Sequence, residues 1–61
     1  MPVIHIDWIE GRSLEQKREV AKRITEAMSE VAKVPPEAVE IVFTEHTRDQ
    51  FSIGGKLLVD R

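Results

Sequence analysis

Hydrophobic and polar residues alternate loosely over residues 2–9, which is the period of a β-strand. One face of this segment carries Ile4, Ile6 and Trp8 on the side of Pro2, and the other carries Val3, His5, Asp7 and Ile9. The alternation predicts a strand whose two faces differ. Glu10-Gly11-Arg12 is predicted to end it.

Residues 14–32 follow the period of an amphipathic helix. Ser13 and Gln16 have the spacing of a capping box and predict where this helix begins, whereas Val34-Pro35-Pro36 predicts its end because proline lacks a backbone N–H. Lys17 falls within the apolar stripe, where its stem can lie flat while its ammonium reaches water. The stripe consists of Leu14, Val20, Ala21, Ile24, Ala27, Met28, Val31 and Ala32.

Residues 39–45 are rich in β-branched and aromatic side chains and predict a second strand, with Val39, Ile41 and Phe43 on one face. A strand, a helix and a strand in this order predict a βαβ unit with parallel strands and a right-handed crossover. A polar loop over residues 46–50 then leads to residues 51–59, a short hairpin or arm. The predicted fold class is α+β, with one domain over residues 1–61.

The chain is too short to bury a large core of its own, since a fold of about 60 residues buries only about 60% of its unfolded surface. Its 61 residues include no cysteine and two isolated histidines, so we expect neither disulfides nor a metal site. The predicted helix covers one sheet face and leaves the other for a partner subunit. A homo-oligomer is therefore predicted.

Charge argues against several classes of partner. Nine basic and eleven acidic residues give a net charge of −2 with the signs interspersed, so no basic face for nucleic acid is expected. There is no signal-peptide pattern and no apolar run near the roughly 20 residues that span a bilayer. These features predict a cytoplasmic protein that binds neither nucleic acid nor membrane.

Pro2 is the candidate for chemistry, because the chain lacks a cysteine nucleophile, a phosphate-binding glycine loop and a metal-binding histidine pair. An initiator methionine before proline is normally removed, which would make Pro2 a free secondary amine. An α-amino group has a reference pKa of about 7.7 to 8.0, suited to a general base near neutrality. Met-Pro starts are common, however, so Pro2 alone is also compatible with an ordinary first residue.

Further motifs accompany Pro2 at defined positions. They are Ile9-Glu10-Gly11-Arg12-Ser13, Glu15-Gln16-Lys17, Thr44-Glu45 and Phe51-Ser52-Ile53-Gly54-Gly55-Lys56. With these motifs in register from end to end, the chain resembles the 4-oxalocrotonate tautomerase (2-hydroxymuconate tautomerase) family, whose catalytic residue is an N-terminal proline.

The resemblance implies a tautomerase β-α-β fold, a hexamer built as a trimer of dimers, and an isomerase without a cofactor or metal. Pro2 would move a proton along a conjugated 2-hydroxy acid, ketonising 2-hydroxymuconate to 2-oxo-3-hexenedioate in aromatic hydrocarbon catabolism. Arg12 would bind a carboxylate of this small-molecule substrate, and Phe51 would wall the pocket and keep the amine neutral. The alternatives are that Arg12 pairs with Glu10 or another carboxylate and that Phe51 fills a subunit contact.

One position departs from the family pattern. The family's second arginine, which polarises the 2-oxo group, falls at Glu40 in an ungapped comparison. Either Arg48, in the loop before Phe51, supplies the missing cation, or the natural substrate differs. His5 and His46 are interpreted as a strand residue and a loop residue rather than as ligands or bases.

Three functions stay open from the sequence. The first is a tautomerase acting on enol acids. The second is a relative that uses Pro2 on another unsaturated acid, by hydration or dehalogenation. The third is a non-catalytic oligomerising module in which Met1 is retained, because an acylated proline nitrogen is no base.

Overall fold

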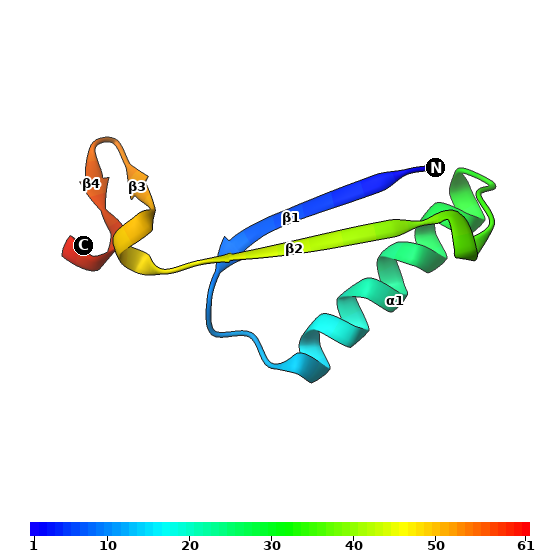
Figure 1. Ribbon diagram of the computed structural model, residues 1–61, viewed down its shortest axis with the longest axis horizontal. Coiled ribbons are helices and arrows are strands. Elements are labelled where there is room, and N and C mark those ends of the chain that lie inside the picture. The colour runs from blue at the N-terminus through cyan, green and yellow to red at the C-terminus, as the bar shows by residue number, and fades with distance from the viewer.

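The computed structural model describes residues 1–61, and its body is a βαβ unit. Strand β1 (Val3–Ile9) and strand β2 (Glu40–His46) are parallel and in register from the pair Val3 and Glu40 to the pair Ile9 and His46. Helix α1 (Leu14–Val31) connects them and runs along one face of the two-stranded sheet (Figure 1). The predicted α+β class and the parallel strands are confirmed.

The alternation along the strands separates the two faces of the sheet. Ile4, Ile6 and Trp8 are half-buried on β1, while the residues between them are exposed. Ile41 and Phe43 are the half-buried apolar residues of β2, and the rings of Trp8 and Phe43 lie 5.3 Å apart between centroids. The assignment of Ile4, Ile6 and Trp8 to one face is therefore confirmed.

Local signals determine both ends of α1. The Ser13 hydroxyl accepts from the Gln16 backbone N–H at 3.1 Å, and the Gln16 side-chain oxygen accepts from the Ser13 N–H at 2.8 Å, as the capping box predicts. At the other end Ala32 is the cap, and Lys33 adopts a left-handed conformation with φ 59°. A short 3₁₀ turn, η1 (Pro36–Ala38), then leads into β2.

Two features of the helix go beyond its predicted pattern. Leu14 and Val31 of the apolar stripe are 61% and 82% exposed, because a sheet of two strands is too narrow to cover the whole stripe. The Lys17 ammonium does not simply reach water. It forms an ion pair with Glu45 on β2, since the helix axis brings it over the end of that strand.

The second strand is shifted by one residue from its predicted range of 39–45. His46 belongs to β2 and not to the following loop, because its carbonyl accepts from the Glu10 N–H at 2.9 Å and so continues the pairing with the first strand's end. Val39 precedes the strand as the cap of η1.

Residues 48–60 form a C-terminal arm, as predicted for 51–59. It contains the 3₁₀ turn η2 (Arg48–Gln50), the antiparallel strands β3 (Ser52–Ile53) and β4 (Lys56–Leu57), and the 3₁₀ turn η3 (Leu58–Asp60). Gly54 and Gly55 turn the hairpin with φ of 62° and 84°, values that a tight two-residue hairpin turn requires. The arm projects beyond the end of the sheet opposite to the N-terminus (Figure 1).

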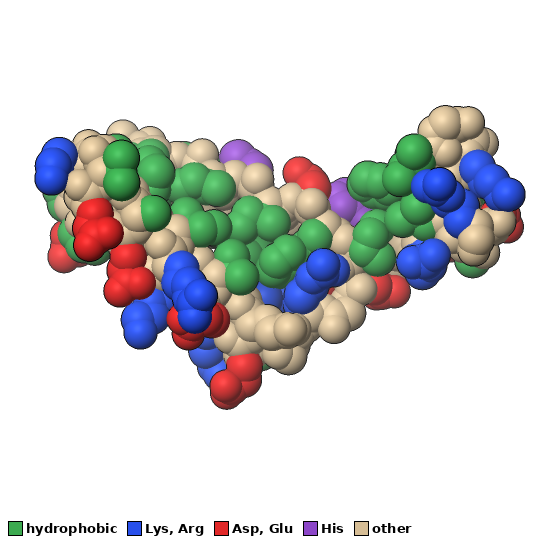
Figure 2. Space-filling view, turned by 180° about the vertical axis from the view of Figure 1, so that it is seen from behind, with side chains coloured by type: hydrophobic (Ala, Val, Ile, Leu, Met, Phe, Trp, Pro, Cys, Tyr) green, Lys and Arg blue, Asp and Glu red, His purple; other side chains and the backbone are tan.

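The isolated chain has no fully buried residue. Its radius of gyration is 14.7 Å, whereas a compact domain of this length would have about 10.5 Å. Hydrophobic side chains run along the body and gather again on the arm (Figure 2). No helix has the length and apolar character needed to cross a membrane. The chain therefore leaves much of its apolar surface uncovered.

Candidate functional site

An open cleft of about 350 Å³ lies between the start of α1 and the end of β1. Its lining combines two arginines with an indole and a short apolar side chain, which suits an anionic ligand with a hydrophobic part. The lining residues are Trp8, Arg12, Gln16, Glu19, Val20 and Arg23.

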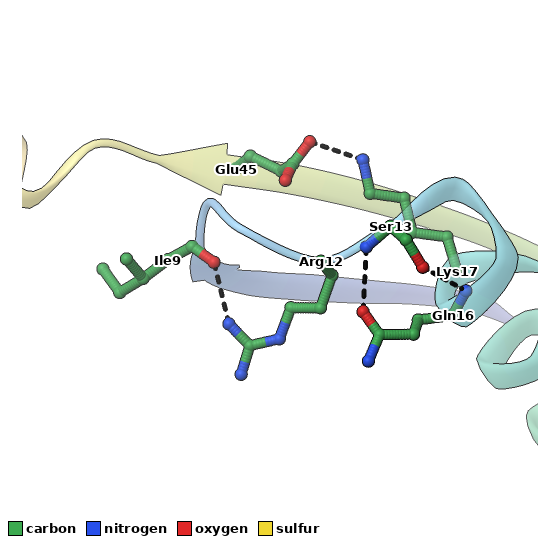
Figure 3. A network of polar contacts seen from close by, with 6 residues as sticks. All are labelled: Ile9, Arg12, Ser13, Gln16, Lys17 and Glu45. Atoms are coloured by element: carbon green, nitrogen blue, oxygen red, sulfur yellow. Dashed lines mark hydrogen bonds and ion pairs between the residues drawn. The ribbon is translucent and has the colours of Figure 1, made fainter.

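Arg12 is held in this cleft by two contacts. Its Nη1 donates to the carbonyl of Ile9 at 2.9 Å (Figure 3), and its guanidinium carbon lies 5.0 Å from the centre of the Trp8 ring, within the range of a cation–π interaction. Arg12 forms no ion pair with any carboxylate of the chain, so the alternative pairing with Glu10 is not found. The remaining donors of its fork are free for a ligand.

The second arginine of the cleft is already paired. Arg23 Nε donates to Glu19 Oε2 at 2.8 Å, one helical turn earlier. This hydrogen bond and the charge of Arg23 hold the pKa of Glu19 below its usual range, and Glu19 in turn raises the pKa of Arg23. Because Glu19 neutralises Arg23, Arg12 is the cation of the cleft that lacks a carboxylate partner.

The segment before α1 aims Arg12. Gly11 has φ 127°, a conformation that favours glycine, and the capping box fixes Ser13 immediately after it (Figure 3). Arg12 is therefore positioned by a defined turn between a strand and a capped helix.

Pro2 lies at the other end of β1. Its carbonyl accepts from the Glu40 N–H at 3.0 Å, which places the carboxylate-bearing residue on the neighbouring strand beside the proline. Its ring is half-buried, whereas Met1 before it is 84% exposed. The bond between Met1 and Pro2 is thus accessible to a processing enzyme.

Phe51 and Arg48 belong to the arm. Phe51 is 36% exposed, and its carbonyl accepts from the Leu58 N–H at 2.9 Å. Arg48 Nη2 donates to the carbonyl of the same Leu58 at 2.9 Å. In this chain Arg48 therefore ties the two ends of the arm together.

One chain does not bring these four residues together. Pro2 precedes the first residue of β1 and Arg12 follows its last, and seven residues of strand span about 23 Å. The arm with Arg48 and Phe51 also lies beyond the far end of the sheet from Pro2 (Figure 1). Any site that uses both Pro2 and Arg12 has to combine different chains.

Two contacts near these residues were not predicted from the sequence. Trp8 was assigned only to the half-buried face, yet it stacks on Arg12, and its buried Nε1–H has no acceptor within the chain. His46 was assigned to a loop, yet its Nε2 donates to Asp7 Oδ1 at 2.9 Å. Strand register determines the second contact, and no local motif signals it. The structure contains no cluster of metal-ligating side chains.

Comparison with known proteins gives a consistent set of relatives. The sequence profile of a family described as "Tautomerase enzyme" matches residues 2–61. A probable tautomerase of Halalkalibacterium halodurans is 38% identical over 61 residues, which is 100% of both chains. Among solved structures, a 4-oxalocrotonate tautomerase homologue superposes with a TM-score of 0.92 at 39% identity, covering 100% of this chain and 97% of that one.

A second solved structure is described as a heterohexamer. The heterohexamer 4-oxalocrotonate tautomerase from Chloroflexus aurantiacus superposes with a TM-score of 0.90 at 30% identity, covering 98% of this chain and 97% of its own. The similarity extends over the whole chain in each case.

Proposed function

The chain belongs to the tautomerase family, and we propose from this premise that Pro2, freed by removal of Met1, is the general base of a cofactor-independent isomerase. Family membership supports an isomerase of the tautomerase type. The finer proposal is a substrate of the 2-hydroxy enol acid class, with 2-hydroxymuconate as its reference member.

Arg12 is the observation that carries this proposal. Its guanidinium lies in a cleft, is oriented by Trp8 and the Ile9 carbonyl, and has no carboxylate partner within the chain. A planar fork with free donors is suited to binding a carboxylate in a bidentate manner. We therefore assign Arg12 the role of holding one substrate carboxylate.

The proposed reaction moves a proton without changing the atoms or the oxidation state of the substrate. The neutral amine of Pro2 accepts the proton of the 2-hydroxyl group, and the resulting ammonium returns a proton to a carbon of the conjugated chain. The enol becomes a 2-oxo acid. Phe51 supports this chemistry by excluding water, because burial disfavours the ammonium form of the amine.

The site of this proposal is shared between chains. Pro2 and Arg12 are about 23 Å apart along β1, and the chain alone has no fully buried residue. Trp8, whose buried indole N–H has no acceptor within the chain, lines the same cleft as Arg12. We propose a homo-oligomer, with the hexamer as the expected form, in which Arg12 and Phe51 of other chains complete the site around each Pro2.

Glu40 favours a second candidate within the same family. Where the family pattern has an arginine that polarises the 2-oxo group, this chain has Glu40, whose backbone N–H donates to the Pro2 carbonyl. The loss of one such electrophilic donor typically costs about 10²- to 10³-fold in rate. A different unsaturated acid, transformed by hydration or dehalogenation with the same amine, is the alternative that this anion favours.

Arg48 is the proposed substitute for the missing cation. Its Nη2 is engaged with the Leu58 carbonyl, but a guanidinium has five N–H donors and the others are not used within the chain. An Arg48→Ala variant with unchanged turnover and substrate affinity would dispose of this role and leave a different natural substrate as the explanation for Glu40.

Ultraviolet-monitored ketonisation of 2-hydroxymuconate tests the proposal. Intact mass first establishes that Met1 is absent, since a retained methionine would support the non-catalytic module. We expect turnover that rises as a group near neutrality loses its proton, and that falls at least about 100-fold in Pro2→Ala and in Arg12→Ala. Turnover equal in all three proteins would contradict the proposal.

A further inference from the structure

Asp7 and His46 meet on the sheet face that α1 leaves uncovered. Asp7 lies opposite Thr44 in the register of the strands, and His46 lies opposite Ile9, so both side chains fall on the same face as diagonal neighbours. The His46 Nε2–H donates to Asp7 Oδ1 at 2.9 Å. This bond joins two residues that are 39 positions apart in the sequence.

The same imidazole contacts the arm. The His46 and Phe51 rings are 6.0 Å apart between centroids and inclined by 60°, which is the edge-to-face geometry that aromatic pairs prefer. Asp7, His46 and Phe51 therefore form a continuous chain of contacts from β1 through β2 to the residue that precedes β3.

Hydrogen bonds connect Phe51 to the rest of the arm. The Phe51 carbonyl accepts from Leu58, and Leu58 accepts in turn from Arg48. The arm extends beyond the end of the sheet (Figure 1), so the contact between His46 and Phe51 lies at its root. A small rotation at this point displaces the whole arm.

We propose that the Asp7–His46 pair positions Phe51 and, through it, the wall of the catalytic pocket. The inference rests on the proposed function, in which Phe51 shields the Pro2 amine of another chain. We assign His46 a positioning role, because its Nε2 is held by Asp7 and its ring contacts Phe51. Asp7 orients the imidazole by accepting a hydrogen bond from its Nε2–H.

The first test measures the arm directly. Deuterium exchange of the Leu58 amide, which donates to the Phe51 carbonyl, is followed in His46→Ala and Asp7→Ala. Both variants are expected to exchange faster than the native protein. Asp7→Asn keeps an oxygen that accepts from Nε2–H and is expected to restore most of the protection. His5→Ala is the matched control, because His5 is an exposed histidine of β1 that forms no hydrogen bond through its side chain.

The second test measures catalysis of 2-hydroxymuconate ketonisation as a double-mutant cycle. His46→Ala is expected to lower kcat/KM about 10-fold through displacement of the pocket wall. The acidic limb of the variant's pH profile of kcat/KM should move to higher pH, because water that enters the pocket favours the ammonium form of Pro2. In a Phe51→Ala background the same substitution should change kcat/KM by less than about 2-fold, because both act through one contact.

The outcomes separate this inference from the proposed function. Unchanged amide exchange in His46→Ala, or additive losses in the cycle, would overturn the positioning role while leaving Pro2 as the base. A native protein without turnover would overturn the proposed function. In that case faster exchange in His46→Ala and Asp7→Ala, with recovery in Asp7→Asn, still supports the pair as the element that holds the arm.

Discussion

Glu40 puts a carboxylate-bearing residue on the strand beside Pro2, since its backbone N–H donates to the Pro2 carbonyl. A nearby negative charge favours the ammonium form of the amine and repels a carboxylate substrate. We expect Glu40→Gln to raise kcat/KM for 2-hydroxymuconate by roughly 3- to 10-fold. The acidic limb of the pH profile of kcat/KM should move to lower pH.

Glu37→Gln is the matched control for this substitution, because Glu37 is an exposed glutamate of η1 three residues earlier. Glu37→Gln should leave both kcat/KM and the acidic limb of its pH profile unchanged. Equal kinetics in the native protein and in Glu40→Gln would show that the Glu40 carboxylate does not act on the site.

Lys33 is the one residue other than glycine with a positive φ, at 59°, and it follows the cap of α1. A residue with a side chain in this conformation is strained by about 1–2 kcal/mol, and substitution by glycine relieves this strain. Part of the relief is offset, because glycine makes the unfolded chain more flexible. Lys33→Gly should therefore increase the free energy of unfolding by about 0.5–1 kcal/mol.

Chemical denaturation at one protein concentration measures this effect. Ala32→Gly is the control with the opposite sign, because Ala32 has an ordinary right-handed conformation and glycine there should destabilise. Destabilisation of similar size in both variants would contradict the assignment of strain to Lys33.

At the residue scale the sequence proposes site residues but not the contacts that surround them. Pro2 and Arg12 stand out because motifs of adjacent residues accompany them. The stacking of Trp8 on Arg12 and the bond between His46 and Asp7 depend on how distant segments meet. A register shift of one residue would send Asp7 and His46 to opposite faces, so composition and periodicity could not reveal their contact.

At the element scale, local signals predict the helix and the hairpin, whereas boundaries set by distant contacts are missed. Ser13, Gln16 and the glycine pair act on neighbours in the chain, and the structure confirms them. His46 extends β2 because its carbonyl bonds to Glu10, and Lys17 meets Glu45 across the helix–sheet interface. Neither contact has a local signature.

Helix α1 also carries a pH-dependent contribution to stability. The hydrogen bond from Arg23 holds the pKa of Glu19 below its unfolded value. The contribution is therefore present above the ordinary glutamate pKa of about 4.3 and is lost as pH falls through the lowered folded-state pKa. Glu19→Gln should lower the denaturation midpoint at pH 7 and leave it nearly unchanged well below that pKa.

The measurement is urea denaturation of native and variant proteins at both pH values. In an Arg23→Gln background, the effect of Glu19→Gln on the denaturation midpoint should no longer depend on pH. A loss of equal size at both pH values would mean that the Glu19 side chain stabilises the helix by packing and not by its charge.

At the scale of the whole molecule, the chain leaves apolar surface uncovered and keeps its proposed site residues apart. It has no fully buried residue, it leaves Leu14 and Val31 of its helix exposed, and it places Pro2 and Arg12 at opposite ends of β1. The proposed assembly would explain these facts together, because it covers the apolar surfaces and joins the two ends of β1 from different chains. The sequence predicts the need for partners from chain length, whereas the separation of the site residues requires the structure. The cytoplasmic location stays a prediction.

Subunit complementation tests the shared site most directly. Met-processed Pro2→Ala and Arg12→Ala proteins, each inactive alone, are dissociated together, reassembled and assayed for 2-hydroxymuconate ketonisation. A site that takes Pro2 from one chain and Arg12 from another should regain about a quarter of the native rate when chains assort at random. Mixed oligomers that stay as inactive as their parents would contradict a site shared between chains.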